Sequence, residues 1–377
     1  MNEKEKLIPQ RRFKEFKNTG TWEQRKLGEF ADISTGKLDA NAMVEDGEYD
    51  FYTSGMKKYR IDTPAFEGPA ITIAGNGATV GYMHLADGEF NAYQRTYVLQ
   101  NFQANRYFLY SEISKKLPRK IAQEARTGNI PYIVMDMLTE LTISLPVLEE
   151  EQAKIGAFFK QLDNTIALHQ RKLELLKEQK TGFLQKMFPK NGSNVPEIRF
   201  SGFTEDWEQR KLIDVAEMFD NLRIPVTASD RVEGNTAYYG ANGIQDYVDG
   251  FTHDGEFVLI AEDGANDLIN YPVNYVKGKI WVNNHAHVVS GKKSELDNLF
   301  LTARIKSMNI SHWLVGGGRA KLNGDVLKKI PLTLPVYEEQ KKIGAYFKHL
   351  DDSIALHQKQ LEVLKETKKS LLQKMFV

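Results

Sequence analysis

The sequence predicts a mixed α/β (α+β) fold in which two pseudo-symmetric globular domains are separated by an antiparallel coiled coil of two long helices. The first observation behind this prediction is a stretch that occurs twice, at 145–188 and 334–376. Both copies contain I-G-A-[FY]-F-K, L-D and I-A-L-H-Q, and both end on L-Q-K-M-F. The second observation is a W-E-Q-R-K-L element that opens each globular half, at 22–27 and 207–212. The repeat is too long for a solenoid unit, which indicates a duplicated half-protein.

The first globular half begins with a polar segment, and its W-E-Q-R-K-L element is expected to start a short helix. Short β-like runs separated by Gly and Asp turns then indicate a mixed domain. We expect strands at 49–53, 70–74, 81–85 and 96–99, and helices at 105–117 and 135–138. The second half has the same order, with strands at 238–240, 257–261, 279–282 and 287–289 and a helix at 296–308.

The two globular halves share a frame and differ almost everywhere else. The segment 73–78, I-A-G-N-G-A, corresponds to 260–265, I-A-E-D-G-A. Gly77 and Gly264 are predicted to lie in turns that need a positive φ. The repeated helices, in contrast, are nearly identical. The near-identical helices therefore predict that one kind of partner is bound twice, and the divergent globular surfaces predict that two different targets are recognised.

The long helices carry a coiled-coil seam, because their apolar positions alternate steps of four and three residues. Pro146 and Pro335 precede acidic runs, as expected at helix N-termini. Two identical seams in one chain predict antiparallel pairing, with Ile155 near Met375 and His169 close to His357. The predicted seam consists of Ile155, Phe159, Leu162, Ile166, His169, Leu173 and Leu176 in the first helix and Ile343, Phe347, Leu350, Ile354, His357, Leu361 and Leu364 in the second.

Composition places the chain among ordinary water-soluble proteins. Its 377 residues suffice for two or three domains, and 41% are hydrophobic. The chain contains no cysteine, so disulfides and thiolate metal sites are excluded. The charged N-terminus and the lack of any long apolar run predict no membrane association and a cytoplasmic location.

Nucleic-acid binding is predicted from local features, since Lys+Arg and Asp+Glu both count 50. Residues 191–333 contain 15 basic and 19 acidic residues, which argues against strong phosphate binding by bulk charge. The candidates are basic residues that suit phosphates and amide or guanidinium side chains that suit purine edges. They are Lys57, Lys58, Tyr59, Arg60, Asn76, Gln94, Arg95, Lys116, Arg119, Lys120, Asn242, Gln245, Asn266, Asn284, Arg319 and Lys321, with Lys115 beside the helical group.

No catalytic or metal-binding motif is evident. No G-x-G-x-x-G loop follows a predicted strand, and no Walker-type lysine loop is present. His285 and His287 are spaced to share one strand face, but no third ligand accompanies them in the sequence. His169 and His357 are interpreted as structural seam residues.

The whole chain resembles the specificity (S) subunit of type I restriction-modification systems. The resemblance rests on the paired W-E-Q-R-K-L openings, the L-P-[VL]-x-E-E-Q-x-K-I-G-x-[FY]-F helix entries and the D-x-x-I-x-L-H-Q bodies. It implies four segments: target-recognition domains at 1–145 and 191–333, a spacer helix with linker at 146–190, and a second spacer helix at 334–377.

The resemblance also implies a set of partners. Each target-recognition domain is expected to read one half of a split sequence in double-stranded DNA. The helices are expected to set the gap between the half-sites and to bind two methyltransferase (M) subunits, and restriction (R) subunits join that complex. The S subunit has no catalytic site and no cofactor of its own, since S-adenosylmethionine, ATP and Mg belong to the partner subunits.

Two other functions fit the same sequence. A two-headed, non-catalytic scaffold that holds two protein ligands is the main alternative, because the repeated helices suit a spacer of any kind. A self-contained methyltransferase is the weaker alternative, since the chain lacks a methyl-donor loop.

Overall fold

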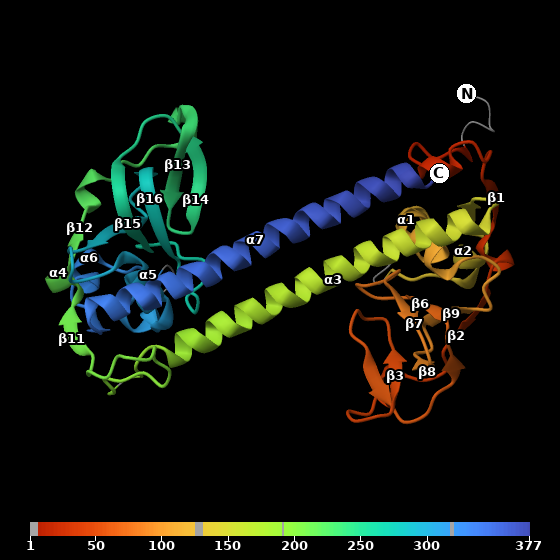
Figure 1. The fold of residues 1–377 in the computed structure, drawn as a ribbon, viewed down its shortest axis with the longest axis horizontal. Coiled ribbons are helices and arrows are strands. Elements are labelled where there is room, and N and C mark those ends of the chain that lie inside the picture. Colours follow the sequence, from red (N-terminus) through yellow and green to blue (C-terminus); the bar gives the residue numbers. More distant parts are fainter. Residues whose placement is uncertain (1–6, 125–130, 191, 317–319) are drawn as a thin grey trace. The chain divides into compact units, whose positions relative to one another are not determined.

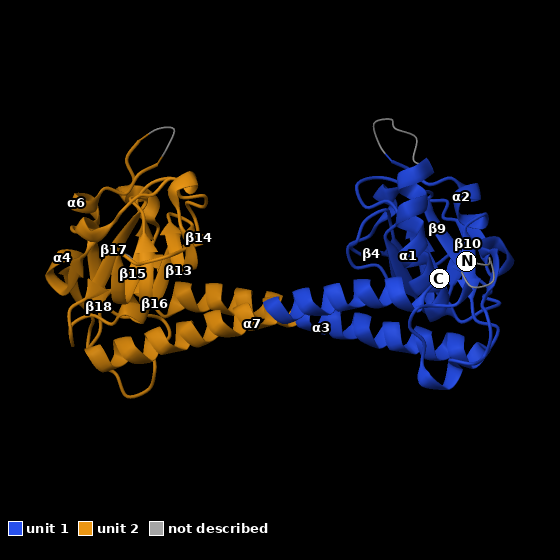
Figure 2. Cartoon of the chain, turned by 90° about the horizontal axis from the view of Figure 1, so that it is seen from above, with its two compact units in different colours: residues 1–170, 359–377 blue, residues 171–358 orange. Residues whose placement is uncertain are grey.

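The computed structural model describes residues 7–124, 131–190, 192–316 and 320–377. Two compact units divide the chain, and each combines segments that are distant in the sequence (Figure 2). Unit 1 comprises Met1–Gln170 and Lys359–Val377, and unit 2 comprises Arg171–Gln358. The predicted α+β class with two domains and two long helices is confirmed. Because the units divide both long helices, the predicted four-segment boundaries stay a prediction.

The two long helices are α3 (Glu149–Lys186) and α7 (Tyr337–Met375), visible in Figure 1. Within unit 1 the start of α3 packs beside the end of α7, since the Phe159 and Phe376 rings lie 5.4 Å apart. Within unit 2 the chain just beyond α3 packs beside the start of α7, with Phe188 and Phe347 5.8 Å apart. The helices are therefore antiparallel in each unit, and Ile155 shares a core cluster with Met375 as predicted.

The seam positions of both helices are buried or half-buried, whereas most positions between them are exposed. Each helix also has one lysine in its seam, and an aspartate of the other helix neutralises it within the same unit. Lys180 pairs with Asp351 in unit 2, and Lys368 pairs with Asp163 in unit 1. His169 belongs to unit 1 and His357 to unit 2, so their proximity stays a prediction.

Unit 1 contains two four-stranded sheets. The first is antiparallel and has the order β2 (Asp32–Thr35), β9 (Thr96–Gln100), β6 (Ala70–Ala74), β7 (Met83–Ala86). The second has the order β4 (Tyr59–Ile61), β3 (Tyr49–Tyr52), β8 (Glu89–Ala92), β5 (Phe66–Glu67), with β3 and β8 parallel. Its helices are α1 (Arg106–Glu124) and α2 (Met135–Thr139), with 3-10 turns at Lys14–Phe16, Leu27–Glu29 and Ala40–Ala42.

Unit 2 contains one six-stranded sheet. Its order is β12 (Ala216–Met218), β17 (Ala286–Gly291), β15 (His253–Ala261), β16 (Val273–Val282), β13 (Glu233–Gly240), β14 (Gly243–Val248). Its short helices are α4 (Leu212–Val215), α5 (Asn298–Ser307) and α6 (Gly324–Leu327), with 3-10 turns at Asp220–Leu222, Ala228–Asp230 and Ile310–Trp313. The strands and helices expected in both halves are present, with ends that differ by a few residues.

The sheets of the two units share one plan. Strand β16 runs unbroken and pairs with both β15 and β13. In unit 1 the matching ten residues form β7 and β8, and a turn at Asp87 and Gly88 divides them. Gly88 and its counterpart Gly278 both have positive φ, at 68° and 91°. A second break separates β5 from β6, which match the two ends of the continuous β15, so two local breaks convert a six-stranded sheet into two four-stranded ones.

The W-E-Q-R-K-L element does not begin a helix at the tryptophan, contrary to expectation. Its E-Q-R-K residues form strand β1 (Glu23–Lys26), which pairs antiparallel with β10 (Thr142–Leu145). In unit 2, β11 (Glu208–Lys211) pairs with β18 (Pro331–Leu334) in the same way. The ladder to a strand more than a hundred residues away outweighs the helix propensity of these residues.

The acidic run at the start of each long helix has a second role besides favouring the helix N-terminus. The buried carboxylate of Glu151 binds the guanidinium of Arg12 through two hydrogen bonds of 2.6 Å. Glu339 binds Arg199 likewise, through two bonds of 2.8 Å. Each bidentate pair fastens the segment before the first strand of a unit to that unit's long helix.

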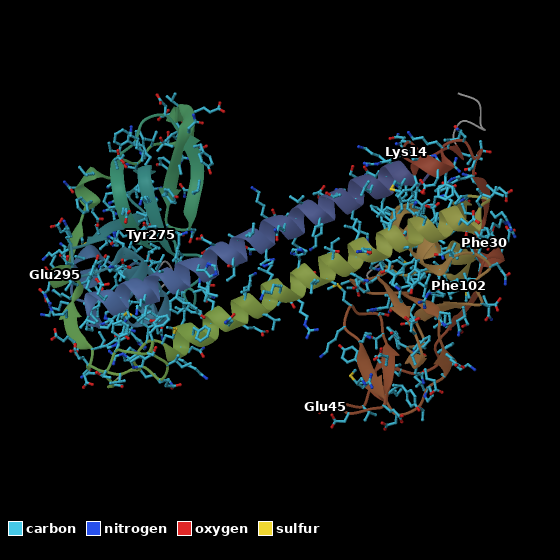
Figure 3. All side chains as sticks on the ribbon, viewed as in Figure 1. Lys14, Phe30, Glu45, Phe102, Tyr275 and Glu295 are labelled. Atoms are coloured by element: carbon cyan, nitrogen blue, oxygen red, sulfur yellow. The ribbon has the colours of Figure 1, made fainter. Side chains whose placement is uncertain are left out.

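Each unit has its own core around a buried tryptophan, Trp22 or Trp207. Phe30 is part of the unit 1 core and Phe102 packs against it (Figure 3). In unit 2, Arg210 of β11 pairs with the carboxylate of Glu295, also labelled there. Among the described residues, no helix is long and apolar enough to cross a membrane.

Candidate nucleic-acid interface

Three loops meet at one end of the sheets in each unit, and the same backbone hydrogen bonds join them. In unit 1 the Gly75 N–H donates to the Arg95 carbonyl at 2.8 Å, and the Ile133 N–H donates to the Gly75 carbonyl at 2.8 Å. In unit 2 the matching bonds run from Glu262 to His285 at 2.9 Å and from Leu322 to Glu262 at 2.7 Å. We call each set of three loops a three-loop junction. The junction of unit 1 comprises residues 75–77, 93–95 and 131–133, and that of unit 2 comprises residues 262–264, 283–285 and 320–322.

Two further contacts confirm the correspondence. The N–H groups of Tyr93 and Asn283 donate to the carbonyls of Tyr52 and Tyr239, at 2.9 and 3.1 Å. One isolated bridge joins Asn76 to Tyr132 and another joins Asp263 to Lys321. Gln94 therefore corresponds to Asn284, and Arg95 to His285. The candidates Asn76, Gln94 and Arg95 of unit 1 and Asn284 and Lys321 of unit 2 thus occupy one structural feature.

The junction of unit 1 is built on glycine and presents polar side chains. A side chain at Gly75 would place its Cβ 2.2 Å from the Arg95 carbonyl oxygen, so the loops of unit 1 approach more closely at this point than a side chain allows. Gly77 has a φ of 86°, as predicted. Gln94 and Arg95 are exposed, and Asn76 accepts a hydrogen bond from the Ser54 hydroxyl at 2.5 Å.

The junction of unit 2 carries a carboxylate, Glu262, at the position that Gly75 occupies in unit 1. Glu262, which replaces Gly75, accepts from Arg223 at 2.7 Å and pairs with Lys321 at 3.0 Å. Asn284 is exposed, and His285 contacts the carboxylate of Asp263. Gly264 has a φ of 70°, as predicted. At this matched position of the frame, unit 1 therefore has an uncharged glycine and unit 2 has an ionised carboxylate.

A buried histidine completes the charge network of unit 2. His287 Nε2 lies 2.8 Å from the Leu322 carbonyl oxygen and Nδ1 lies 2.6 Å from Asp220. Both neighbouring oxygens can accept a hydrogen bond from the ring. Burial opposes ionisation of Asp220, but hydrogen bonds from His287 and a backbone N–H, with the charge of Arg223, hold its pKa below the usual value.

The fold brings two carboxylates from other segments, Asp220 and Glu262, beside His287, and His285 is not part of this group. Ligand atoms of Asp220, Glu262 and His287 lie within 4.8 Å of one another. Burial opposes ionisation of Glu262, but hydrogen bonds from Arg223 and Lys321 keep the pKa of that carboxyl below its usual value. Arg223 pairs with both carboxylates and Lys321 with Glu262, so the three groups belong to an ion network.

The basic turn at 57–60 lies beside β4, an edge strand. Lys58 and Arg60 both pair with Asp50, each at 2.7 Å. Lys57 lies over the Tyr59 ring, with Nζ 5.4 Å from the centroid. One carboxylate thus offsets part of the positive charge of this turn, and Lys57 is exposed.

The helical basic group has structural partners that the sequence did not reveal. Lys115 donates to the carbonyls of Phe376 and Val377, at 3.0 and 2.9 Å. Lys116 pairs with the buried carboxylate of Glu112 at 2.7 Å. Lys120 pairs with Glu124, and Arg119 is exposed. Lys115 and Lys116 therefore fasten α1 to α7 and β10, and helical spacing alone does not show this.

The remaining candidates of unit 2 surround its junction. Both ends of the Asn242 amide hold the neighbouring loop, because Nδ2 donates to the Gly264 carbonyl at 2.9 Å and Oδ1 accepts from the Asn266 N–H at 3.0 Å. Gln245 is exposed and accepts from Asn283 at 3.3 Å. Arg319 lies outside the described residues.

A family model for the type I restriction modification DNA specificity domain matches the chain twice, at residues 19–178 and 204–366. A putative type I restriction enzyme specificity subunit of Haemophilus influenzae is 47% identical over 154 residues, which cover 41% of this chain and 39% of that protein. The EcoDI specificity subunit of Escherichia coli is 25% identical over 85% of this chain and 79% of its own length.

The fold also matches a solved structure. The type I restriction-modification S subunit from M. genitalium superposes with a TM-score of 0.79 at 18% identity, over 98% of this chain and 99% of the other. Each matched region of the family model includes one W-E-Q-R-K-L element, one whole three-loop junction and part of one long helix. The chain belongs to the family of type I restriction-modification specificity subunits.

Proposed function

We propose that this chain reads a split DNA sequence for a type I restriction-modification complex, with one three-loop junction facing each half-site. The observation that carries the proposal is that two junctions share backbone hydrogen bonds while their side chains differ. A conserved frame with different donors and acceptors is what two readers of different bases require.

The junction side chains suit direct readout. Gln94 and Arg95 are exposed, and amide and guanidinium groups of this kind pair with adenine and guanine edges in the major groove. Asn284 offers the same amide chemistry in unit 2, whereas His285 lies against a carboxylate. The cations of the unit 2 network are paired with its carboxylates, so this junction relies on base contacts more than on charge.

The long helices are proposed as the spacer and as the binding site for two M subunits. Helix α3 has 38 residues, equivalent to ~57 Å at ~1.5 Å per residue. Among the large apolar side chains that stay exposed on the helices outside the seam are Leu168 (68%) and Val363 (58%) in unit 1, and Leu175 (51%) and Leu356 (56%) in unit 2. In the repeat, Leu168 corresponds to Leu356 and Leu175 to Val363. Each unit thus presents one side chain of each kind, as two equal partners require.

The chain is proposed to be non-catalytic. S-adenosylmethionine, ATP and Mg are assigned to the M and R subunits, because this chain's conspicuous ionised cluster is internally neutralised. R subunits join through the assembled complex. The alternative of a two-headed protein scaffold is distinguished by whether duplex DNA binds with sequence preference.

The test is a gel shift of the full chain on a library of random duplexes, alone and with purified M subunits. We expect the chain with M subunits to select a bipartite sequence with a fixed gap, and to keep that selection as salt rises while non-specific binding falls. Binding without any selected sequence, in the presence of active M subunits, contradicts the proposal and favours the scaffold.

A further inference from the structure

A pocket of about 610 Å³ in unit 2 lies where the chain leaves α3 and passes the end of α5. It is separate from the three-loop junction and from the exposed apolar side chains of the helices. Its volume falls in the range of small-molecule sites, about 300–1,000 Å³. The residues that give the pocket its character are Lys186, Lys190, Glu197, Arg304, His312 and Trp313.

The guanidinium of Arg304 is the feature of this pocket that needs explanation. Arg304 is only 9% exposed, and its Nη1 donates to the Ser307 hydroxyl at 3.3 Å. Its Nε is buried without a hydrogen-bond partner. Within the described part of the chain, no carboxylate forms an ion pair with it. Burial lowers the pKa of Arg304 to about 10, so the group still carries its charge at neutral pH.

Unit 1 shows how the same frame treats a buried charge that has an ion-pair partner. Phe108 of α1 and Phe300 of α5 make equivalent ring contacts, with Phe376 at 5.2 Å and Phe188 at 5.7 Å. Four residues beyond Phe108 lies Glu112, the counterpart of Arg304. Glu112 accepts the Ser144 N–H at 3.0 Å and pairs with Lys116 at 2.7 Å. A buried charge without an ion pair is strongly unfavourable. The Ser307 hydroxyl and the Phe188 ring, whose centroid lies 5.7 Å from the guanidinium, carry no net charge, so Arg304 calls for an external anion.

The charges around the pocket identify the kind of anion. Three cations, Lys186, Lys190 and Arg304, face one carboxylate, Glu197, which already pairs with Lys190. The surplus of two positive charges matches a phosphate dianion, which carries about −1.5 to −2 at pH 7, better than a carboxylate or a DNA phosphodiester. A guanidinium fork also fits the geometry of phosphate oxygens.

We propose that this pocket of unit 2 binds a phosphate dianion, free or as the monoester group of a small molecule, through Arg304 and Lys186. The site is independent of DNA reading and of the methyltransferase-binding surface. It makes the stability of unit 2 depend on the phosphate ligand, because a ligand that binds only the folded state stabilises it.

The test measures binding of inorganic phosphate to the full chain by calorimetry, and its effect on thermal unfolding at constant ionic strength. We expect one phosphate site that raises the unfolding temperature. Lys186→Ala should weaken phosphate binding about tenfold, as expected for one charge-assisted hydrogen bond. Lys374→Ala, the same change in the other copy of the repeat, should leave phosphate affinity unaltered.

Arg304→Met separates binding from folding. Without phosphate, this variant should unfold at the same temperature as the parent or higher, because it removes an uncompensated buried charge and keeps the packing. It should lose the stabilisation by phosphate. The proposal is overturned if the parent chain binds no phosphate, or if both pocket variants bind phosphate as the parent does. It is also overturned if the variants keep their affinity for phosphate and lose affinity only for a DNA duplex without terminal phosphates.

Discussion

The bidentate pair of Arg199 and Glu339 should contribute strongly to the stability of unit 2. The carboxylate is 0% and the guanidinium 12% exposed, and two hydrogen bonds of 2.8 Å join them. Removing one partner leaves the other buried and unpaired, which costs about 3–5 kcal/mol. We therefore expect Glu339→Ala to lower the free energy of unfolding of unit 2 by that amount.

Urea unfolding of the purified chain measures this loss, and hydrogen exchange shows which unit is affected. Protection should fall in unit 2 and stay unchanged in unit 1. The matched variant Glu151→Ala should show the reverse, because Arg12 and Glu151 make the same pair in unit 1.

Two controls test the reasoning about burial. Lys341→Ala removes an exposed ion pair with Glu338 on the same helix and should have a much smaller effect. The double variant Arg199→Met with Glu339→Leu should recover most of the lost stability, since apolar replacement of a buried pair is often neutral. A loss from Glu339→Ala no larger than that from Lys341→Ala refutes the argument.

Three further predictions follow from the junctions and the helices. Asp220 and Glu262 have depressed pKa values in the folded chain, so the stability that they contribute is complete above the unfolded pKa of about 4 and is lost as pH falls. Hydrogen exchange measured during an acid titration should therefore show that unit 2 opens early. The double variant Asp220→Asn with Glu262→Gln should flatten this dependence on pH. Gly75→Ala places a Cβ 2.2 Å from a carbonyl oxygen of the facing loop, so it should destabilise unit 1 by about 1–3 kcal/mol and weaken recognition of one half-site. Urea unfolding measures the first effect and gel shift the second. An unchanged urea unfolding transition contradicts the geometry. Inserting seven residues after Leu173 and seven after His357 preserves the seam and lengthens the helix pair by ~10 Å. The gap between the two half-sites of the target should therefore grow by about three base pairs at ~3.4 Å each. An unchanged gap in an active variant shows that the helices do not set it.

Much of the fold was predictable because its signals are periodic. The alternating steps of four and three identified the seam from Ile155 onward, and the identity of the two copies indicated antiparallel pairing. The glycines at 77 and 264 were recognisable because their segments match. Each of these features depends on local sequence or on its repetition within the chain.

The features that sequence did not reveal depend on distant partners. Nothing within Glu23–Lys26 identifies a strand, because its partner β10 lies more than a hundred residues away. Lys115 suits a phosphate-binding helix until the carbonyls at the end of α7 occupy its ammonium group. The buried clamp of Arg12 on Glu151 joins segments 139 residues apart. Arg12 and Arg199 occupy matched positions before each tryptophan, and this repetition was the available signal.

The central claim is that each three-loop junction reads one half of the target. Methylome sequencing of a host that expresses this chain with its M subunits tests it most directly. Gln94→Ala with Arg95→Ala keeps the backbone frame and should change the methylated bases of one half-site only. Asn284→Ala with His285→Ala should change only the other half-site, and the gap should stay constant in both variants. If either variant alters both half-sites, or neither variant alters any base while both fold and support methylation, the account is contradicted.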